Sequence, residues 1–201
     1  MMKVGLLTGG GDCPGLNAAI RAVVKATTKE KNIEVLGIRD SFQGLLHSPP
    51  QVLPLSLPQV VDIYLKGGTI LGTYNKNQGE YSAHTEDEMS TIISNYKRLQ
   101  LDALIVIGGE GTQTIASQLA DKGIPIIGIP KTIDNDLPGT EQTIGFATCV
   151  DLVAESVTRL QSTAESHDRI MVLEVMGRDS GYIGLYGGIS GGADIILIPE
   201  I

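Results

Sequence analysis

The residues of this sequence with the most chemical potential form one segment, Pro130-Lys131-Thr132-Ile133-Asp134-Asn135-Asp136. It follows an apolar run, Ile124–Ile129, which we expect to be a strand that Pro130 closes. Ligands of open α/β sheets bind at the carboxyl ends of the strands. One carboxylate there could accept a proton from a hydroxyl group while the other helps to hold a metal ion. Because Asp and Asn also favour turns, the segment taken alone is equally typical of a turn.

The composition narrows the possible classes of protein. A chain of 201 residues with 42% hydrophobic residues and 25 glycines fits one α/β domain, or one and a part. A net charge of −8, two Phe and no Trp argue against a nucleic-acid partner, which would need basic and stacking side chains. No apolar run approaches the roughly 20 residues of a membrane span. We therefore expect no membrane partner.

Two cysteines, Cys13 and Cys149, make neither a disulfide framework nor a CxxC zinc motif. The first residues run directly into a predicted strand, so no secretory signal is visible. We expect a cytoplasmic protein.

Short apolar runs alternate with helical patterns along the chain. This alternation predicts a doubly wound, mostly parallel α/β sheet. The predicted strands are Val4–Thr8, Glu34–Ile38, Leu101–Ile107, Ile124–Ile129, Arg169–Val175 and Ala193–Ile198. Four helices are predicted, at Gln59–Lys66, Glu86–Gln100, 112–122 and Cys149–Ser162. Two more are predicted to begin at Leu16 and after Gly181. The chain stops directly after the last predicted strand, so we expect two parts, 1–136 and 137–201, the second an α/β lobe that is incomplete.

Three loops, 9–15, 108–112 and 176–181, place glycines between a strand end and a helix start. Such loops offer backbone N–H groups and a positive helix end to phosphate. The first loop does not fit the dinucleotide pattern, because Pro14 stands at the last glycine position. It does not fit the P-loop pattern either, because Leu16-Asn17 replace Lys and Ser/Thr. The loops predict a phosphorylated ligand bound by neither standard motif.

The polar residues near these loops could supply the parts of a phosphoryl transfer, which are positioning, a metal ion, cations and a base. Glu110 is acidic within a phosphate-type loop, which suggests a Mg²⁺ ligand, since Mg²⁺ is held by one or two carboxylates plus phosphates. Alternatively, Glu110 only stabilises the helix N-terminus, by about 0.3–1 kcal/mol. The remaining candidates are Gly11, Gly109, Gly111 and Thr112 for phosphates, Asp136 for the metal, Asp134 as base, and Lys131, Thr132 and Arg178 for developing negative charge.

Six segments resemble the 6-phosphofructokinase family. They are GGGDCPGLNAAIRAVV, GGTILGT, ALIVIGGEGT, IPKTIDND, TIGFATCVD and EVMGRDSGYIG, and the resemblance runs from residue 3 to residue 200. It implies ATP-dependent phosphorylation of O1 of fructose 6-phosphate to fructose 1,6-bisphosphate in glycolysis, with Mg²⁺, by an allosteric homodimer or homotetramer. Residues 1–136 would bind the nucleotide, and residues 137–201 would begin the sugar-phosphate lobe. We expect the 201-residue chain alone to be poorly active.

The resemblance also implies roles for single residues. Asp134 matches the catalytic base, and Thr132 and Arg178 match residues that stabilise the transferring phosphoryl group. Glu110 matches the magnesium-site acid, usually Asp in the family. Gly11, Gly109, Gly111 and Thr112 match contacts to the nucleotide phosphates. Thr132, Asp134, Asp136, Arg169, Met176, Gly177 and Arg178 match the substrate site, with Arg169 reaching a neighbouring subunit's substrate. Arg21 and Lys25 match a region that binds effectors in bacterial members.

Two departures concern the phosphoryl donor. Asn75-Lys76 stand where ATP-dependent bacterial members have an arginine, so Lys76 would supply a point charge only. Pyrophosphate-dependent members typically have Asp where Gly111 stands and Lys where Lys131 stands. Gly111 leaves room for the α-phosphate of ATP, so we favour ATP. The alternatives are a pyrophosphate-dependent phosphotransferase on the same sugar and a non-catalytic fragment that binds a phosphorylated ligand.

Overall fold

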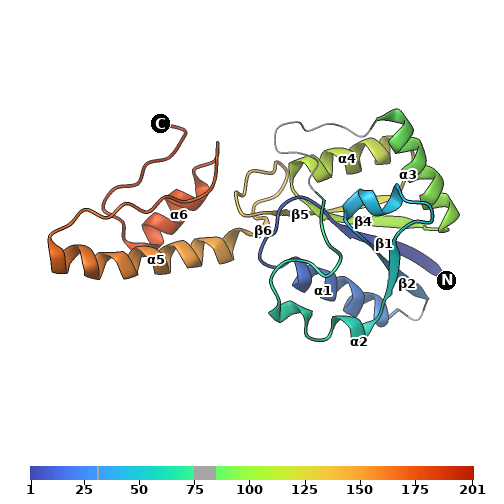
Figure 1. Ribbon diagram of the computed structural model, residues 1–201, viewed down its shortest axis with the longest axis horizontal. Coiled ribbons are helices and arrows are strands. Elements are labelled where there is room, and N and C mark those ends of the chain that lie inside the picture. The colour runs from blue at the N-terminus through green and yellow to red at the C-terminus, as the bar shows by residue number, and fades with distance from the viewer. Residues whose placement is uncertain (31, 75–84) are drawn as a thin grey trace. The chain divides into compact units, whose positions relative to one another are not determined.

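The computed structural model describes residues 1–30, 32–74 and 85–201 (Figure 1). The described chain divides into two compact units, Met1–Lys131 and Thr132–Ile201. Within the described residues, no helix has the length and apolar character needed to cross a membrane.

The first unit is built on a mostly parallel sheet. Its strands are β1 (Met2–Thr8), β2 (Ile33–Ile38), β3 (Val52–Leu55), β4 (Ala103–Gly108) and β5 (Ile126–Thr132), in the order β3-β2-β1-β4-β5. β1 pairs in parallel with β2 and β4, β4 pairs in parallel with β5, and only β3 is antiparallel to its neighbour. The predicted doubly wound α/β class is confirmed. The chain leaves β1 in one direction for β2 and β3 and returns on its other side as β4 and β5, so the switch point lies between β1 and β4.

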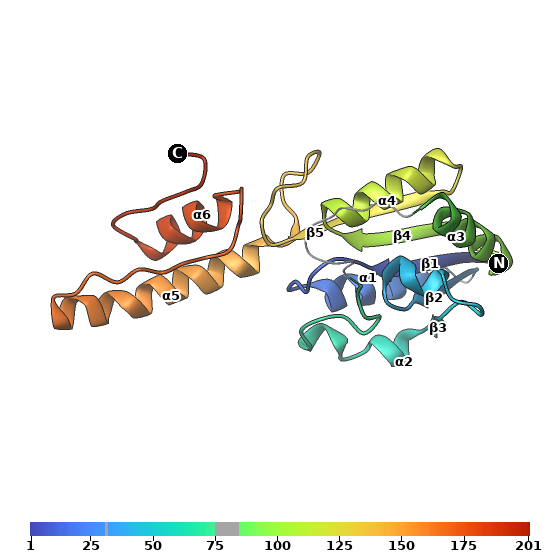
Figure 2. The same cartoon turned by 45° about the horizontal axis from the view of Figure 1, so that its top comes forward.

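Helices cover both faces of this sheet. α1 (Leu16–Thr28) and α2 (Leu57–Val60) lie on one side, and α3 (Glu86–Arg98) and α4 (Glu110–Asp121) lie on the other (Figures 1 and 2). The main core packs α3, α4 and the 3-10 helix η1 (Ser41–Leu45) on the sheet. Its fully buried members include Leu7, Ile38, Leu45, Ile92, Leu104, Val106 and Leu119.

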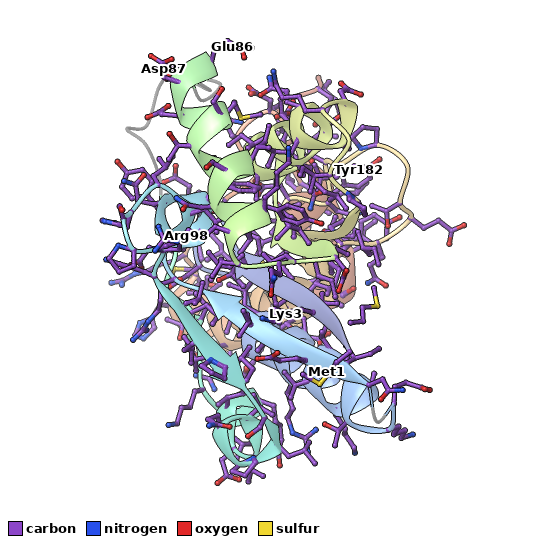
Figure 3. The ribbon with its side chains drawn as sticks, turned by 90° about the vertical axis from the view of Figure 1, so that its right-hand side faces the viewer. Met1, Lys3, Glu86, Asp87, Arg98 and Tyr182 are labelled. Carbon is purple, nitrogen blue, oxygen red and sulfur yellow. The ribbon has the colours of Figure 1, made fainter. Side chains whose placement is uncertain are left out.

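α3 begins at a capping box. The side chain of Thr85 accepts from the backbone N–H of Glu88, and the Glu88 carboxylate accepts from the backbone N–H of Thr85. Glu86 and Asp87 lie in its first turn and Arg98 in its last, as Figure 3 shows. Acidic residues at the start and a basic residue at the end stabilise the helix, because their charges interact favourably with the helix dipole.

Two details of the connection between β2 and α3 differ from the prediction. The helix predicted at Gln59–Lys66 is wrong, because the segment forms α2 and the separate 3-10 helix η2 (Ile63–Leu65). The end of this segment is hydrogen-bonded to α1, because the side-chain amide of Asn17 donates to the Lys66 carbonyl at 3.0 Å. β3 was not among the predicted strands, and Pro54 is tolerated within it because β3 is an edge strand.

The strand β5 continues through Pro130 to Thr132, so the prediction that Pro130 closes the strand is wrong. Pro130 pairs with Gly108, the last residue of β4. The missing N–H therefore falls where the ladder with β4 already ends, and proline can be accommodated there.

The second unit is a helix pair. Thr132 opens it, and the two-residue strand β6 (Ile144–Gly145) leads into α5 (Phe146–His167), which is longer than the predicted Cys149–Ser162. α6 (Tyr182–Gly191) packs on α5, with Phe146 edge-on to Tyr186 at 5.7 Å between ring centroids. A Cβ on Gly187 would lie 2.5 Å from Cγ1 of Val153, so glycine allows this close approach of the two helices.

The strands predicted at Arg169–Val175 and Ala193–Ile198 are wrong for the described chain, in which neither segment forms a strand. Ile170, Val172 and Leu197 are 94%, 88% and 89% exposed. A strand needs a neighbour that takes its backbone hydrogen bonds, and neither segment has a ladder partner among the described residues. The apolar residues alone therefore do not produce a sheet here.

The core assignment can be tested at two aliphatic residues on adjacent strands. Leu104 of β4 is 0% exposed, whereas Ile127 of β5 is 59% exposed. Leu104→Ala should lower the free energy of unfolding by about 2–5 kcal/mol, because it leaves a cavity. Ile127→Ala, measured alongside by urea denaturation, should cost far less. Equal losses would contradict the assigned core.

Candidate phosphate-binding loops and catalytic segment

Parallel pairing brings two of the glycine-rich loops together at one edge of the first unit's sheet. Thr8 of β1 pairs with Ile107 of β4, and Gly108 pairs with Pro130 of β5. The backbone N–H of Gly9 donates to the Ile107 carbonyl at 2.9 Å, which continues the ladder into the first loop. The loops 9–15 and 108–112 therefore start side by side at the carboxyl ends of β1 and β4, whereas the third loop, 176–181, belongs to the second unit.

The first loop is held by side chains from two distant segments. Thr73 Oγ1 donates to the carbonyl of Gly10, and Lys131 Nζ donates to the carbonyl of Gly11 at 2.8 Å. The Lys131 residue is only 4% exposed. The loop ends at Gly15, which adopts a φ of 92° and precedes α1.

The GGTILGT segment is attached to the same sheet edge. Thr8 Oγ1 donates to the Gly72 carbonyl at 2.9 Å and lies 2.8 Å from Thr69 Oγ1. The buried Asn17 amide oxygen accepts from the backbone N–H of Ile70 at 2.9 Å. Sequence reasoning missed Thr8 and Asn17, and Asn17 gave a signal as a polar residue within the apolar stripe of α1. Asn75 and Lys76 lie outside the described residues.

The second loop passes directly into α4. Gly109 precedes the helix, Glu110 is exposed in its first turn, and Thr112 is 8% exposed. A Cβ on Gly9 would lie 2.6 Å from Thr112 Oγ1, so Thr112 packs against the strand ends. Gln113, which the sequence did not single out, donates to the carbonyls of Val106, Gly108 and Ile129 at 3.2 Å each and so ties β4 to β5.

The described residues contain no cluster of three or more His, Cys, Asp or Glu that could hold a metal ion. Mg²⁺ at phosphate sites needs only one or two carboxylates, because the phosphates supply further ligands. Glu110, exposed at the start of a helix that follows a phosphate-type loop, fits that kind of site.

In the second unit, the candidate catalytic segment that begins at Thr132 is held by side-chain hydrogen bonds. Thr132 Oγ1 accepts from the Asp134 backbone N–H at 3.1 Å, and Asn135 adopts a φ of 53°. The buried Thr143 donates its hydroxyl to the Thr132 carbonyl at 2.7 Å and its backbone N–H to Asn135 Oδ1 at 2.9 Å. The segment is therefore both a turn and a candidate site, since the turn fixes the backbone of Asp134. Asp136 is exposed.

Asp134 lies close to α5 and to the third glycine-rich loop. Ser180 Oγ donates to the Asp134 carbonyl at 2.9 Å, and the carboxylate oxygen Oδ1 is buried. Burial raises the pKa of the Cys149 thiol, and the negative charge of Asp134 raises it further. The thiol therefore stays protonated at neutral pH beside the carboxylate.

The third loop depends on Gly177. It adopts a φ of 142°, and a Cβ there would lie 2.3 Å from the Ser180 carbonyl oxygen. Arg178 is exposed, with Nε 3.3 Å from Asp179 Oδ2. Met176 is 73% exposed, and Arg169 is exposed just beyond the end of α5.

Two further charged groups occupy defined positions. Glu200 Oε1 accepts from the backbone N–H of Gly181 at 2.7 Å, at the start of α6. Sequence reasoning missed Glu200, although a carboxylate directly after an apolar run is a visible signal. In the first unit, Arg21 donates to the Val61 carbonyl at 3.2 Å and lies over the Tyr64 ring at 4.9 Å from its centroid.

The first unit is thus a doubly wound α/β unit with glycine-rich loops at the carboxyl ends of its strands, the class of fold that binds phosphorylated ligands there. A family model of phosphofructokinase matches residues 3–201. The chain belongs to the phosphofructokinase family.

Curated relatives carry two kinds of name. A "pyrophosphate--fructose 6-phosphate 1-phosphotransferase" of Dictyoglomus thermophilum is 48% identical over 200 residues, which are 100% of this chain and 56% of the relative. An "ATP-dependent 6-phosphofructokinase 1" of Nostoc sp. is 51% identical over 208 residues, covering 99% of this chain and 56% of the relative. The chain therefore spans little more than half the length of these relatives.

Solved structures show the same fold. Phosphofructokinase of Pichia pastoris superposes with a TM-score of 0.84 at 29% identity, covering 100% of this chain and 21% of that one. A pyrophosphate-dependent phosphofructokinase of Marinobacter aquaeolei superposes with a TM-score of 0.83 at 26% identity, covering 100% of this chain and 54% of that one.

The proximity of Cys149 and Asp134 can be tested by alkylation. Because burial and the Asp134 charge both disfavour the thiolate, Cys149 should react with iodoacetamide at pH 8 more slowly than a free cysteine peptide. Asp134→Asn should speed the reaction without bringing it to the peptide's rate, since burial remains. Mass spectrometry of the Cys149 peptide measures the rate, and Asp136→Asn is the control. An unchanged rate in Asp134→Asn would show that the two groups are not coupled.

Proposed function

We propose that the full-length protein is an ATP-dependent 6-phosphofructokinase, which transfers a phosphoryl group from ATP to O1 of fructose 6-phosphate. The observation that carries this proposal is the family match through residues 3–201, which includes both GGEGT and PKTIDND. The ordered Asp134 turn and the phosphate-type loops support it.

Each step of the transfer has a candidate residue. Asp134 accepts the proton of the attacking sugar hydroxyl, and the hydrogen bonds of Thr132 and Ser180 to its backbone fix its position. Thr132 and Arg178 donate to the charge that develops on the transferring phosphoryl group. Gly11, Gly109, Gly111 and Thr112 belong to the loops that would hold the donor phosphates. Asp136, Arg169, Met176 and Gly177 would complete the sugar-phosphate site, with Arg169 acting across a homo-oligomer interface.

Glu110 would hold the Mg²⁺ of the nucleotide, and Asp136 matches the second carboxylate near the metal in the family. The ion supplies charge neutralisation on the phosphate oxygens when it is bound. Asn75 and Lys76 would complete the donor site.

The donor is inferred from Gly111, which adds no side chain to the first turn of α4. The second candidate is a pyrophosphate-dependent phosphotransferase on the same sugar. It is favoured by Lys131 and by the 48% identity to a relative of that name. One assay series decides between them: the full-length gene product with fructose 6-phosphate and Mg²⁺, offered ATP or pyrophosphate. Transfer from ATP supports the proposal, transfer from pyrophosphate alone supports the second candidate, and no transfer contradicts both.

Asp134→Asn should lower kcat by about 10²–10⁴, because the amide cannot accept the proton. Binding of fructose 6-phosphate, measured by calorimetry, should change little, since the shape of the side chain is kept. Asp151→Asn, an exposed carboxylate on α5 of the same unit, is the matched control and should stay active. A fully active Asp134→Asn protein would exclude Asp134 as the base.

Gly111→Asp should weaken use of ATP by about tenfold or more, because the new carboxylate would crowd and repel the α-phosphate. Use of pyrophosphate, which has no such group, should suffer much less. The matched control is Ser117→Asp, which adds the same charge to an exposed position of α4. KM for each donor is the measured quantity, and equal losses for both donors would rule out this role of Gly111.

A further inference from the structure

Consecutive carbonyl groups of the first glycine-rich loop are each bound by a side chain that is distant in sequence. The carbonyl of Gly10 accepts from Thr73 Oγ1, and that of Gly11 accepts from Lys131 Nζ at 2.8 Å. Lys131 is 4% exposed, and lysine is almost never buried to this degree unless its ammonium group is bound. A Cβ on Gly10 would lie 3.4 Å from Lys131 Nζ, so the ammonium lies directly beneath the loop.

These two hydrogen bonds fix the orientation of two peptide planes. A trans peptide is planar, and its C=O and N–H groups point in opposite directions. Binding the Gly10 carbonyl therefore turns the Gly11 N–H away from Thr73, and binding the Gly11 carbonyl turns the Asp12 N–H away from Lys131. Among the described residues, apart from Gly11 itself and its two chain neighbours, no heavy atom lies within 4 Å of the position of a Cβ on Gly11, so the backbone is open there.

We propose that Lys131 and Thr73 are positioning residues for the phosphoryl donor, which orient the Gly11 and Asp12 N–H groups toward its phosphates. This inference rests on the proposed function. A glycine loop without such bonds could equally present its carbonyls, which repel phosphate, because glycine adopts many backbone conformations. The ammonium group of Lys131 thus orients the loop backbone, and its positive charge also favours the negatively charged donor phosphates.

This role differs in its kinetics from a direct action on the transferring group. A residue that orients donor-binding N–H groups changes donor affinity, whereas a residue that contacts only the transition state changes kcat. Lys131→Met keeps the length of the side chain and removes its donor. Thr73→Val keeps the shape and removes the hydroxyl, while Thr73→Ser keeps the hydroxyl.

The test is titration calorimetry of ATP, and separately of pyrophosphate, on the full-length protein, together with KM and kcat. Lys131→Met should weaken donor binding about tenfold or more, and Thr73→Val about threefold, while Thr73→Ser stays near the wild type. KM for fructose 6-phosphate and kcat at saturating donor should change by less than about twofold. Lys97→Met, at an exposed lysine on α3, is the matched control and should bind the donor normally.

A second readout reports the N–H groups themselves. Pyrophosphate added to ¹⁵N-labelled wild-type protein should shift the amide signals of Gly11 and Asp12, and the shift should be reduced in Thr73→Val. If Lys131→Met does not fold, the pair Thr73→Val and Thr73→Ser decides the question.

Unchanged donor affinity in a folded Thr73→Val protein would overturn the inference, as would a Lys131→Met protein that loses kcat only. These results are distinct from failure of the proposed function. If the wild-type protein transfers no phosphoryl group, that function fails, while the titrations with ATP and pyrophosphate still decide whether Lys131 and Thr73 orient the loop.

Discussion

The parallel register of β1, β4 and β5 is the constraint on which the candidate phosphate-binding edge depends. It places the ends of the strands opposite one another, with Thr8 beside Ile107 and Gly108 beside Pro130. Every loop that leaves this edge must satisfy the backbone groups that the ladder no longer pairs. In this protein, polar side chains such as Thr8 and Gln113 meet that need. The same bonds that end the sheet therefore shape the loops.

Burial explains why polar residues at this edge act as a network. Asn17, Thr112 and Lys131 are each less than a tenth exposed, and a buried polar group is costly unless it is bound. Asn17 and Lys131 each bind backbone carbonyls that are distant in sequence. These hydrogen bonds give the loops a defined conformation, which glycine-rich segments lack by themselves because glycine adopts many backbone conformations. Preorganised N–H groups are what binding of a phosphate requires.

The sequence was sufficient for features that follow from local pattern. The apolar runs identified four of the strands in the first unit, and the glycines located the loops, because both depend on neighbouring residues. It was insufficient where the local structure depends on a partner that is distant in sequence. Ile170 and Leu197 have strand-forming neighbours in sequence but no ladder partner among the residues that the structure describes. The 3-10 helix η2 ends where the Asn17 side chain donates to the Lys66 carbonyl. The roles of Thr8 and Gln113 were invisible because their partners lie in other elements.

The same limit applies to the phosphoryl donor. Lys131 was a signal for pyrophosphate because pyrophosphate-dependent members of the family typically have a lysine at this position. In the structure its ammonium binds the Gly11 carbonyl, a group that the loop has whichever donor is used. A lysine in that position is compatible with ATP, provided that the second loop leaves room for the longer phosphate chain. Gly111 lies in the first turn of α4, and we propose that it leaves this room, so the two residues need not conflict.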